Sequence, residues 1–137
     1  MEVTTRGFHS NEHENAIKLI FTMKTYIAHR IQGEPVVDVV QSNIRRYRLS
    51  PRRSQRIVNH SPTGFEWNYY GSGPAQLALA ILLDCTNDRE TAQRGYQRFK
   101  DQIIGPAPEE GFTITEGQIR EWLKKLSLFS ATTPPAP

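Results

Sequence analysis

Cysteine is nearly absent from this chain of 137 residues, which contains only Cys85. A single cysteine cannot form a disulfide within the chain, and without a second one a zinc site built on thiolates is excluded. No stretch reaches the ~20 apolar residues that a membrane-spanning helix requires. The first ten residues also lack the apolar region of a signal peptide, so we expect a cytoplasmic protein that does not contact a membrane.

Acidic residues are missing from one long internal segment. Between residues 39 and 65 there is no Asp or Glu, and the basic residues are all arginines: Arg45, Arg46, Arg48, Arg52, Arg53 and Arg56. The net charge of the chain is +3, so this +6 segment leaves −3 for the other residues. The rigid donor fork of arginine suits phosphate and carboxylate groups. The segment is therefore either an anion-binding surface or the charged edge of a sheet, where charge prevents pairing with another sheet.

The composition is that of a soluble globular protein, with 37% hydrophobic and 23% charged residues. The length suits one domain with a core of its own. We predict an N-terminal extension at residues 1–22, an α+β domain at residues 23–128, and a disordered Pro-rich tail at residues 129–137. In the extension, His9 and His13 with Glu12 and Glu14 are expected to be a solvated tail, so we predict no metal site and no cofactor.

The first half of the chain carries strand patterns and the second half carries helix patterns. Residues 26–31 and 36–40 read as strands around a turn at residues 32–35. Residues 44–49 and 55–59 are further candidates for short strands. Residues 112–114 fit a short strand or an extended lead-in to the last helix, and residues 17–23 fit a strand or a helix. This order predicts an α+β fold, in which a small antiparallel sheet from the N-terminal half is covered by about three C-terminal helices.

The central helix has a clear start and an apolar body. Pro74 suits the first helical position, and Ser72 before it can cap the free N–H groups. In residues 75–83 only Gln76 is polar, so we expect this helix to be buried on most sides.

Two later helices have capping boxes at their starts. Asn87 and Glu90 have the spacing of a capping box, and so do Thr115 and Gln118. The first of these helices ends at Gly105, which precedes a proline. The apolar residues at helical spacing are Ala92, Tyr96, Phe99 and Ile103 in the first helix, and Ile119, Trp122, Leu123 and Leu126 in the second.

Residues 59–84 resemble a family of small uncharacterised bacterial and phage proteins. The residues that carry the resemblance are Asn59-His60-Ser61-Pro62-Thr63-Gly64-Phe65-Glu66-Trp67, Tyr69 and Gly71-Ser72-Gly73-Pro74-Ala75-Gln76-Leu77-Ala78-Leu79-Ala80. The similarity extends more weakly over about residues 26–126. Asn68 and Tyr70 depart from the family pattern, which has Gly and a small residue there; Asn68 can preserve a backbone turn, because Asn tolerates the left-handed region. The resemblance implies a fold and a site, and no activity.

The loop before the central helix is a second candidate for anion binding. Gly71, Ser72 and Gly73 adjoin a helix N-terminus, where free N–H groups and the helix dipole favour a phosphate or carboxylate. Tyr70 is the aromatic residue that we expect to be exposed beside them. The alternative is a tight turn that seats the helix, with Glu66 or another side chain meeting the amides.

The aromatic residues of this loop also have two interpretations. In an extended segment Phe65, Trp67 and Tyr69 share one face. That face fits the stacking of bases or of a nucleotide ring. It fits equally the packing of a core beneath the helix.

Catalysis is an alternative to binding. His60, Glu66, Ser72 and Asp84 carry the available chemistry, but we expect Ser72 to cap the helix and Asp84 to belong to its end. His60 and Glu66 then remain for a hydrolase or transferase that acts on nucleotides. The other interpretation of His60 is a hydrogen-bonded structural histidine.

The leading hypothesis is a non-enzymatic binding protein of a phage or mobile element. It recognises an anionic partner, which is a nucleic acid, a nucleotide signal or an acidic host protein, through the arginines and the loop of residues 70–73. An inhibitor of host defence fits this description by analogy with the family's setting. A third hypothesis is an assembly subunit whose aromatic loop packs against a partner chain. The oligomeric state is open.

Overall fold

A computed structural model of the protein describes residues 23–42 and 44–132. The predicted extension at residues 1–22, with His9, Glu12, His13 and Glu14, lies outside these residues. The predicted tail lies partly outside them, at residues 133–137. Helix α5 (Glu116–Thr132) runs into the first part of that predicted tail. The domain boundaries themselves stay a prediction.

The sheet has four antiparallel strands in the order β3-β2-β1-β4. β1 (Lys24–Ile31) and β2 (Glu34–Gln41) form a hairpin. β3 (Arg45–Arg48) pairs with the second half of β2, and β4 (Phe112–Thr115) pairs with the first half of β1. Gln32 and Gly33 have φ values of 52° and 82°, which gives the hairpin a two-residue turn whose twist matches the strands. The strands predicted at residues 26–31, 36–40, 44–49 and 112–114 are confirmed.

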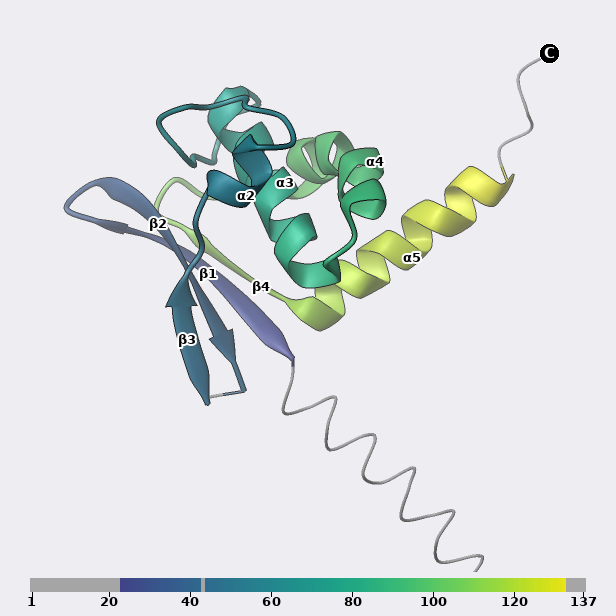
Figure 1. Ribbon diagram of the computed structural model, residues 1–137, viewed down its shortest axis with the longest axis horizontal. Helices are drawn as coiled ribbons and strands as arrows, with labels where there is room; N and C mark the ends of the chain where they lie inside the picture. Colours follow the sequence, from purple (N-terminus) through teal and green to yellow (C-terminus); the bar gives the residue numbers. More distant parts are fainter. Residues whose placement is uncertain (1–22, 43, 133–137) are drawn as a thin grey trace, which may run out of the picture.

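Helices cover one face of the sheet (Figure 1). On that face the strand residues alternate with the pleat, and the register sets Tyr26 opposite both Val39 and Ile114. These three residues are buried beneath the helices. Asp38 and the arginines at positions 46 and 48 point to the other face, which no described helix covers.

The buried helix at the centre is α3 (Ser72–Thr86), and all of residues 73–83 are buried, as the apolar run predicts. Its predicted start is wrong by two residues, because Gly71 is the N-cap and Ser72 already belongs to the helix without a side-chain capping bond. The Gly71 carbonyl accepts the N–H of Ala75 at 3.1 Å. Pro74 therefore lies within the first turn, where an N–H has no partner inside the helix.

The strand predicted at residues 55–59 is also wrong. A short helix, α2 (Arg52–Gln55), and a turn stand there. The Ser54 hydroxyl donates to the Pro51 carbonyl at 2.8 Å and accepts from the Gln76 amide at 2.8 Å. Backbone groups within residues 58–61 also bind the Gln76 side chain. A buried side chain thus takes the backbone groups that a strand would pair with a neighbouring strand.

The remaining helices are α4 (Arg89–Phe99), the π-helical η1 (Lys100–Ile104) and α5. Asp88 rather than Asn87 caps α4, by accepting two N–H groups of its first turn, while Asn87 ends α3 with a φ of 51°. Gly105 ends η1 as predicted. The capping box at the start of α5 is confirmed: Thr115 and Gln118 exchange hydrogen bonds of 2.9 and 3.1 Å. An antiparallel sheet followed mainly by helices makes the fold α+β, as predicted.

Candidate functional site

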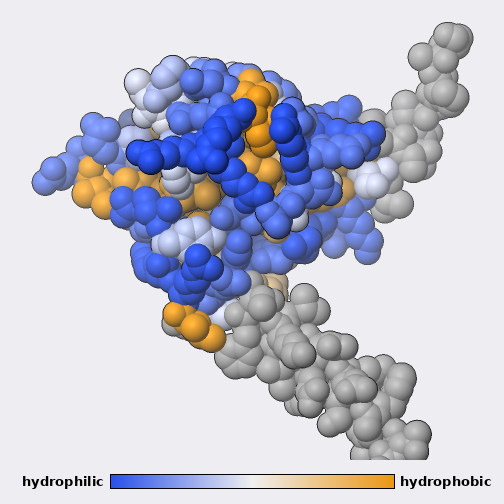
Figure 2. Space-filling view, viewed as in Figure 1, coloured by the Kyte–Doolittle hydropathy of each residue, from blue (hydrophilic) through white to orange (hydrophobic). Residues whose placement is uncertain are grey.

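The arginines of residues 45–56 lie on two neighbouring elements at one edge of the molecule. Three are on β3, which is an edge strand, two are on α2, and one follows α2 directly. All are exposed. Figure 2 shows hydrophilic residues over α2 and over β3, with paler and hydrophobic residues between them. We call this set the arginine band: Arg45, Arg46, Arg48, Arg52, Arg53 and Arg56.

A buried carboxylate on β2 organises two members of the band. Asp38 pairs with Arg48 in the strand register, and its Oδ1 accepts from Arg48 Nε at 2.8 Å. Its Oδ2 accepts from Arg46 Nη2 at 3.2 Å and lies 2.7 Å from His29 Nε2. Burial alone would raise the pKa of the Asp38 carboxyl, but the hydrogen bonds from Arg48, His29 and Arg46 outweigh it and lower that pKa to about 2.

Asp38 uses only part of the hydrogen-bonding capacity of these arginines. Arg48 donates to it through Nε, which leaves both Nη groups, and Arg46 donates through Nη2, which leaves Nε and Nη1. The two side chains are 53% and 62% exposed. Because their guanidinium groups are already held in place, a phosphate or carboxylate can bind them with less loss of side-chain freedom.

The other arginines of the band are held less firmly. The Arg45 guanidinium lies 4.8 Å from the centre of the Tyr47 ring. Arg53 donates to the side chain of the residue that ends α3. The side chains of Arg52 and Arg56 have no partner within residues 23–42 and 44–132. Arg45 lies on the helix-covered side of β3 and the other three on or directly after α2, whereas the pair that Asp38 orients points to the other face of the sheet.

The loop before α3 packs closely onto the start of that helix. The Tyr69 ring lies over Gly71 so closely that a Cβ atom there would overlap it, and a Cβ atom at Gly73 would lie 2.7 Å from the Cβ of Glu66. The glycines thus allow the loop to approach the helix. The Glu66 carboxylate meets the Arg30 guanidinium, at 2.8 and 3.2 Å, rather than the amides of α3.

The predicted loop residues and the arginines of β3 lie far apart. Residues 59–71 are at the end of the molecule opposite to the β2–β3 connection (Figure 1). α3 extends away from residues 70–73 for about 22 Å at 1.5 Å per residue. Tyr70 is 58% exposed, as expected, and its ring packs against Gly105. The structure therefore divides the predicted site residues between two surfaces, of which the arginine band is the larger.

The aromatic residues of the loop belong mainly to the core. Phe65 and Trp67 are buried, which confirms the core-packing alternative for these two, whereas Tyr69 is 48% exposed. Trp67 packs edge-on against Phe112 at 5.9 Å between ring centres. The Arg30 guanidinium covers the Trp67 ring at 4.5 Å. Neither Phe65 nor Trp67 presents an open ring face for base stacking.

His60 and Glu66, the alternative catalytic residues, have different partners. His60 Nε2 lies 2.7 Å from the Tyr96 hydroxyl on α4, and the two rings pack at 5.5 Å. Glu66 pairs with Arg30 on β1. No hydrogen bond or ion pair joins His60 to Glu66 in the part of the chain that the structure describes, so each side chain serves a separate contact.

Sequence reasoning missed a second carboxylate cluster. Asp84, near the end of α3, accepts hydrogen bonds from Tyr26 at 2.5 Å, Tyr47 at 2.8 Å and Lys24 at 3.1 Å. Burial, reinforced by Asp84, raises the pKa of both phenols, so both remain protonated donors. The three donors occupy this carboxylate and join β1 and β3 to α3.

The Asp38 cluster was missed as well, although the sequence carries a signal for it. Asp38 stands alone among valines in Val36-Val37-Asp38-Val39-Val40, where a strand otherwise has no polar residue. A charged residue at such a position requires a partner on a neighbouring strand. The identity of that partner depends on the register, which no local pattern supplies.

Within residues 23–42 and 44–132, no group of three or more His, Cys, Asp or Glu side chains is placed to hold a metal ion. None of the helices described has the length and apolar content to cross a membrane.

Comparisons with known proteins relate this chain to a described family. Residues 26–125 match the model of a family described as a family of unknown function, DUF6166. Neither the search of curated proteins nor the search of solved structures found a match.

Proposed function

We propose that this chain, which belongs to the DUF6166 family of unknown function, is a binding protein that recognises an anionic partner through its arginine band. The observation that carries the proposal is the arrangement around Asp38. This buried carboxylate orients Arg46 and Arg48 on an uncovered sheet face and leaves most of their N–H donors directed to solvent.

The extent of the band favours an extended partner. One phosphate or carboxylate occupies one or two guanidinium groups, whereas the band continues from β3 onto α2. The only carboxylate that accepts hydrogen bonds from it in the described residues is Asp38. A nucleic acid is therefore the first partner class that we test, and an acidic protein surface is the second. A nucleotide signal would occupy the Arg46–Arg48 pair alone.

The biological setting belongs to the same proposal. The resemblance of residues 59–80 to bacterial and phage proteins supports the proposal of a phage or mobile-element setting. A basic surface suits an inhibitor that blocks a nucleic acid or an acidic host protein by occupying it. The inhibitor role is an analogy with the setting of the family and does not depend on a particular residue of this chain.

Charge reversal on and directly after α2 tests the proposal. The double variant Arg52→Glu/Arg56→Glu removes two basic side chains that have no partner to lose, so the fold should persist. We expect binding of a labelled single-stranded oligonucleotide of about 20 nucleotides to weaken roughly tenfold near 50 mM salt. The slope of log K against log salt should fall by roughly 1.5, because two phosphate contacts are lost. Fluorescence anisotropy measures both quantities.

The matched control is Arg89→Glu/Arg94→Glu, which changes the charge equally on α4. It should alter oligonucleotide binding less than twofold. Equal weakening in both double variants would show that only net charge matters and would refute a role of the band. The absence of saturable binding to single-stranded DNA, duplex DNA and polyglutamate would refute the proposal as a whole.

A further inference from the structure

A groove between α4 and α5 lies in the helical layer, on the side of the molecule away from β3 (Figure 1). It consists of two adjoining hollows of about 560 and 460 Å³ that share Arg98 and Leu126. The α4–α5 groove is defined by Arg94, Gly95 and Arg98 on α4 and by Leu123, Lys124 and Leu126 on α5.

The floor of the groove is apolar. A Cβ atom at Gly95 would lie 3.5–3.6 Å from Leu82, Trp122 and Leu126, so the α4 backbone approaches these side chains directly. The apolar stripe of α5 is fully buried at Ile119 but only half-buried from Trp122 to Leu126. The stripe therefore continues past the edge of the core and leaves apolar surface that no element within residues 23–42 and 44–132 covers.

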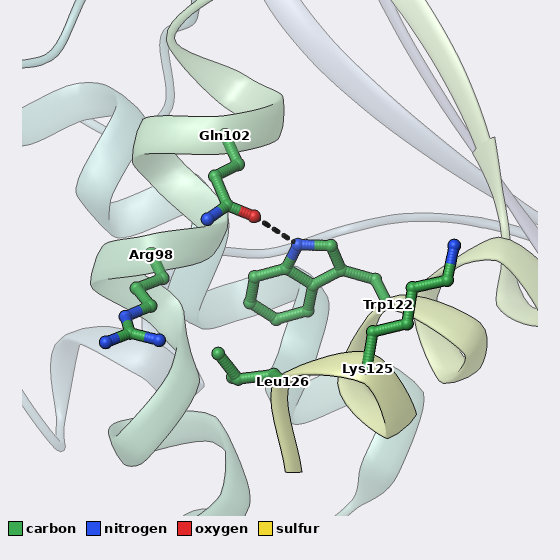
Figure 3. A pocket seen from close by; sticks show the side chains of 5 residues that line it. All are labelled: Arg98, Gln102, Trp122, Lys125 and Leu126. Carbon is green, nitrogen blue, oxygen red and sulfur yellow. Dashed lines mark hydrogen bonds between the residues drawn. The ribbon is translucent and has the colours of Figure 1, made fainter. Parts of the chain in front are cut away.

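One wall of the groove is fixed by an aromatic side chain. Figure 3 shows the Trp122 indole reaching from α5 to η1, where its Nε1 donates to Gln102 Oε1 at 2.8 Å. Phe99 packs edge-on against the same ring at 5.1 Å. Arg98 and Lys125 lie on either side of the indole, with Leu126 beside it. A fixed wall makes the groove a preformed surface.

The rim of the groove is basic. Arg94, Arg98, Arg120 and Lys124 line the larger hollow, and neither hollow is lined by an Asp or Glu. Arg120 is engaged with Glu116 at 2.9 Å, and Arg94 lies 3.6 Å from Glu90 in a highly exposed pair. Exposed pairs of this kind contribute little, so a partner can replace the second one at little cost.

We propose that the α4–α5 groove binds an acidic amphipathic segment of a partner protein. Apolar side chains of the segment cover Leu123 and Leu126, and its carboxylates pair with Arg94, Arg98 and Lys124, in the manner of an amphipathic helix that docks in a groove. The phosphates of a nucleic acid would pair with the basic rim, but they would leave the apolar floor without a complementary surface. A second copy docked through the same face would place the two basic rims against each other.

An NMR titration tests this proposal with a synthetic probe. The probe is a peptide of about 16 residues with Leu at helix-face spacing and Glu at the flanking positions. Added to the ¹⁵N-labelled protein, it should shift the amide signals of Gly95, Leu123 and Leu126. A peptide with Lys in place of every Glu should shift them at least tenfold less at the same concentration.

Protein variants separate the groove from the arginine band. Arg94→Glu/Lys124→Glu should weaken binding of the acidic peptide about tenfold. Leu126→Ser should also weaken binding, because it removes apolar surface from the floor of the groove. Arg52→Glu/Arg56→Glu carries the same charge change on and directly after α2. It should leave the peptide concentration that half-saturates the shifts of the Gly95, Leu123 and Leu126 signals within twofold, even if the arginine band also binds the peptide. Amide spectra of the variants confirm that each is folded.

Three results would overturn the proposal. One is the absence of shifts in the groove signals at about 1 mM acidic peptide, the limit of a weak specific contact. Another is equal binding of the lysine peptide. The third is displacement of the acidic peptide from the groove by an oligonucleotide at lower concentration, which would assign the groove to nucleic acid.

Discussion

Replacement of Gln76 by Leu tests how the arginine-bearing segment is attached to the core. Gln76 is fully buried and is the one polar residue within residues 73–83. Its Oε1 accepts the N–H groups of His60 at 2.8 Å and Ser61 at 3.1 Å. Its Nε2 donates to Ser54 Oγ at 2.8 Å and to the Val58 carbonyl at 3.2 Å. The amide thus joins α3 to the turn that follows α2.

The expected cost follows from the burial of these four partners. Gln76→Leu removes one hydrogen bond from each of these four groups, and the Ser54 hydroxyl keeps its bond to the Pro51 carbonyl. An unpaired buried polar group costs about 1–3 kcal/mol, with smaller values where water reaches it. Ser54 and Ser61 are buried, whereas His60 and Val58 are half-buried, so the sum is roughly 3–6 kcal/mol. Burial of the leucine side chain adds about 1–2 kcal/mol to the free energy of unfolding. We expect a net loss of about 2–4 kcal/mol, a large part of the ~5–15 kcal/mol typical of a domain.

Urea unfolding, followed by the fluorescence of Trp67 and Trp122, measures this loss at constant m-value. The control is Gln97→Leu, which makes the same exchange at an exposed position of α4 and should change the free energy of unfolding by less than about 0.5 kcal/mol. A loss below about 1 kcal/mol for Gln76→Leu, or one no larger than the control's, would refute the reasoning.

Two further predictions concern ionisable groups. The pKa of Asp38 is about 2 in the folded protein and 3.8 ordinarily, so its stabilisation is complete above about pH 5 and is lost as the pH falls through 2. Asp38→Asn should remove about 1–2 kcal/mol of that pH dependence, measured by urea midpoints between about pH 2 and 6; an unchanged profile would contradict this. Cys85 is 6% exposed, and burial, followed by the charge of Glu116, raises the pKa of its thiol to about 11. At neutral pH it should react with a disulfide reagent at least about 100-fold more slowly than free cysteine. Rapid labelling of the folded protein would contradict the burial of this thiol.

The fold could be predicted where the signals are local. The two-residue turn at Gln32 and Gly33 and the capping box of Thr115 and Gln118 need only neighbouring residues, and both are present. The error at residues 55–59 arose from a distant partner. Their sequence suits a strand, but the backbone there is bound by Gln76, which local patterns cannot connect to it.

In the candidate site, too, local features could be predicted from the sequence and features that depend on distant residues could not. The arginine excess is visible in the sequence because it is a property of one segment. The orientation of Arg46 and Arg48 depends on Asp38 and His29, which only the register of three strands brings together. The distance of these arginines from residues 70–73 depends in turn on the direction of α3 across the sheet (Figure 1).

The contacts of the motif at residues 59–80 indicate where the function of the protein should be sought. His60 is bound to Tyr96, Glu66 to Arg30, and the Trp67 indole donates to the Glu109 carbonyl at 2.9 Å. Replacement of side chains committed to such contacts should destabilise the fold, whatever the protein binds. A resemblance carried by these residues therefore identifies a scaffold and leaves its partner unspecified. The arginine band and the rim of the α4–α5 groove consist largely of exposed side chains, so we expect the identity of the partner to depend on these two surfaces.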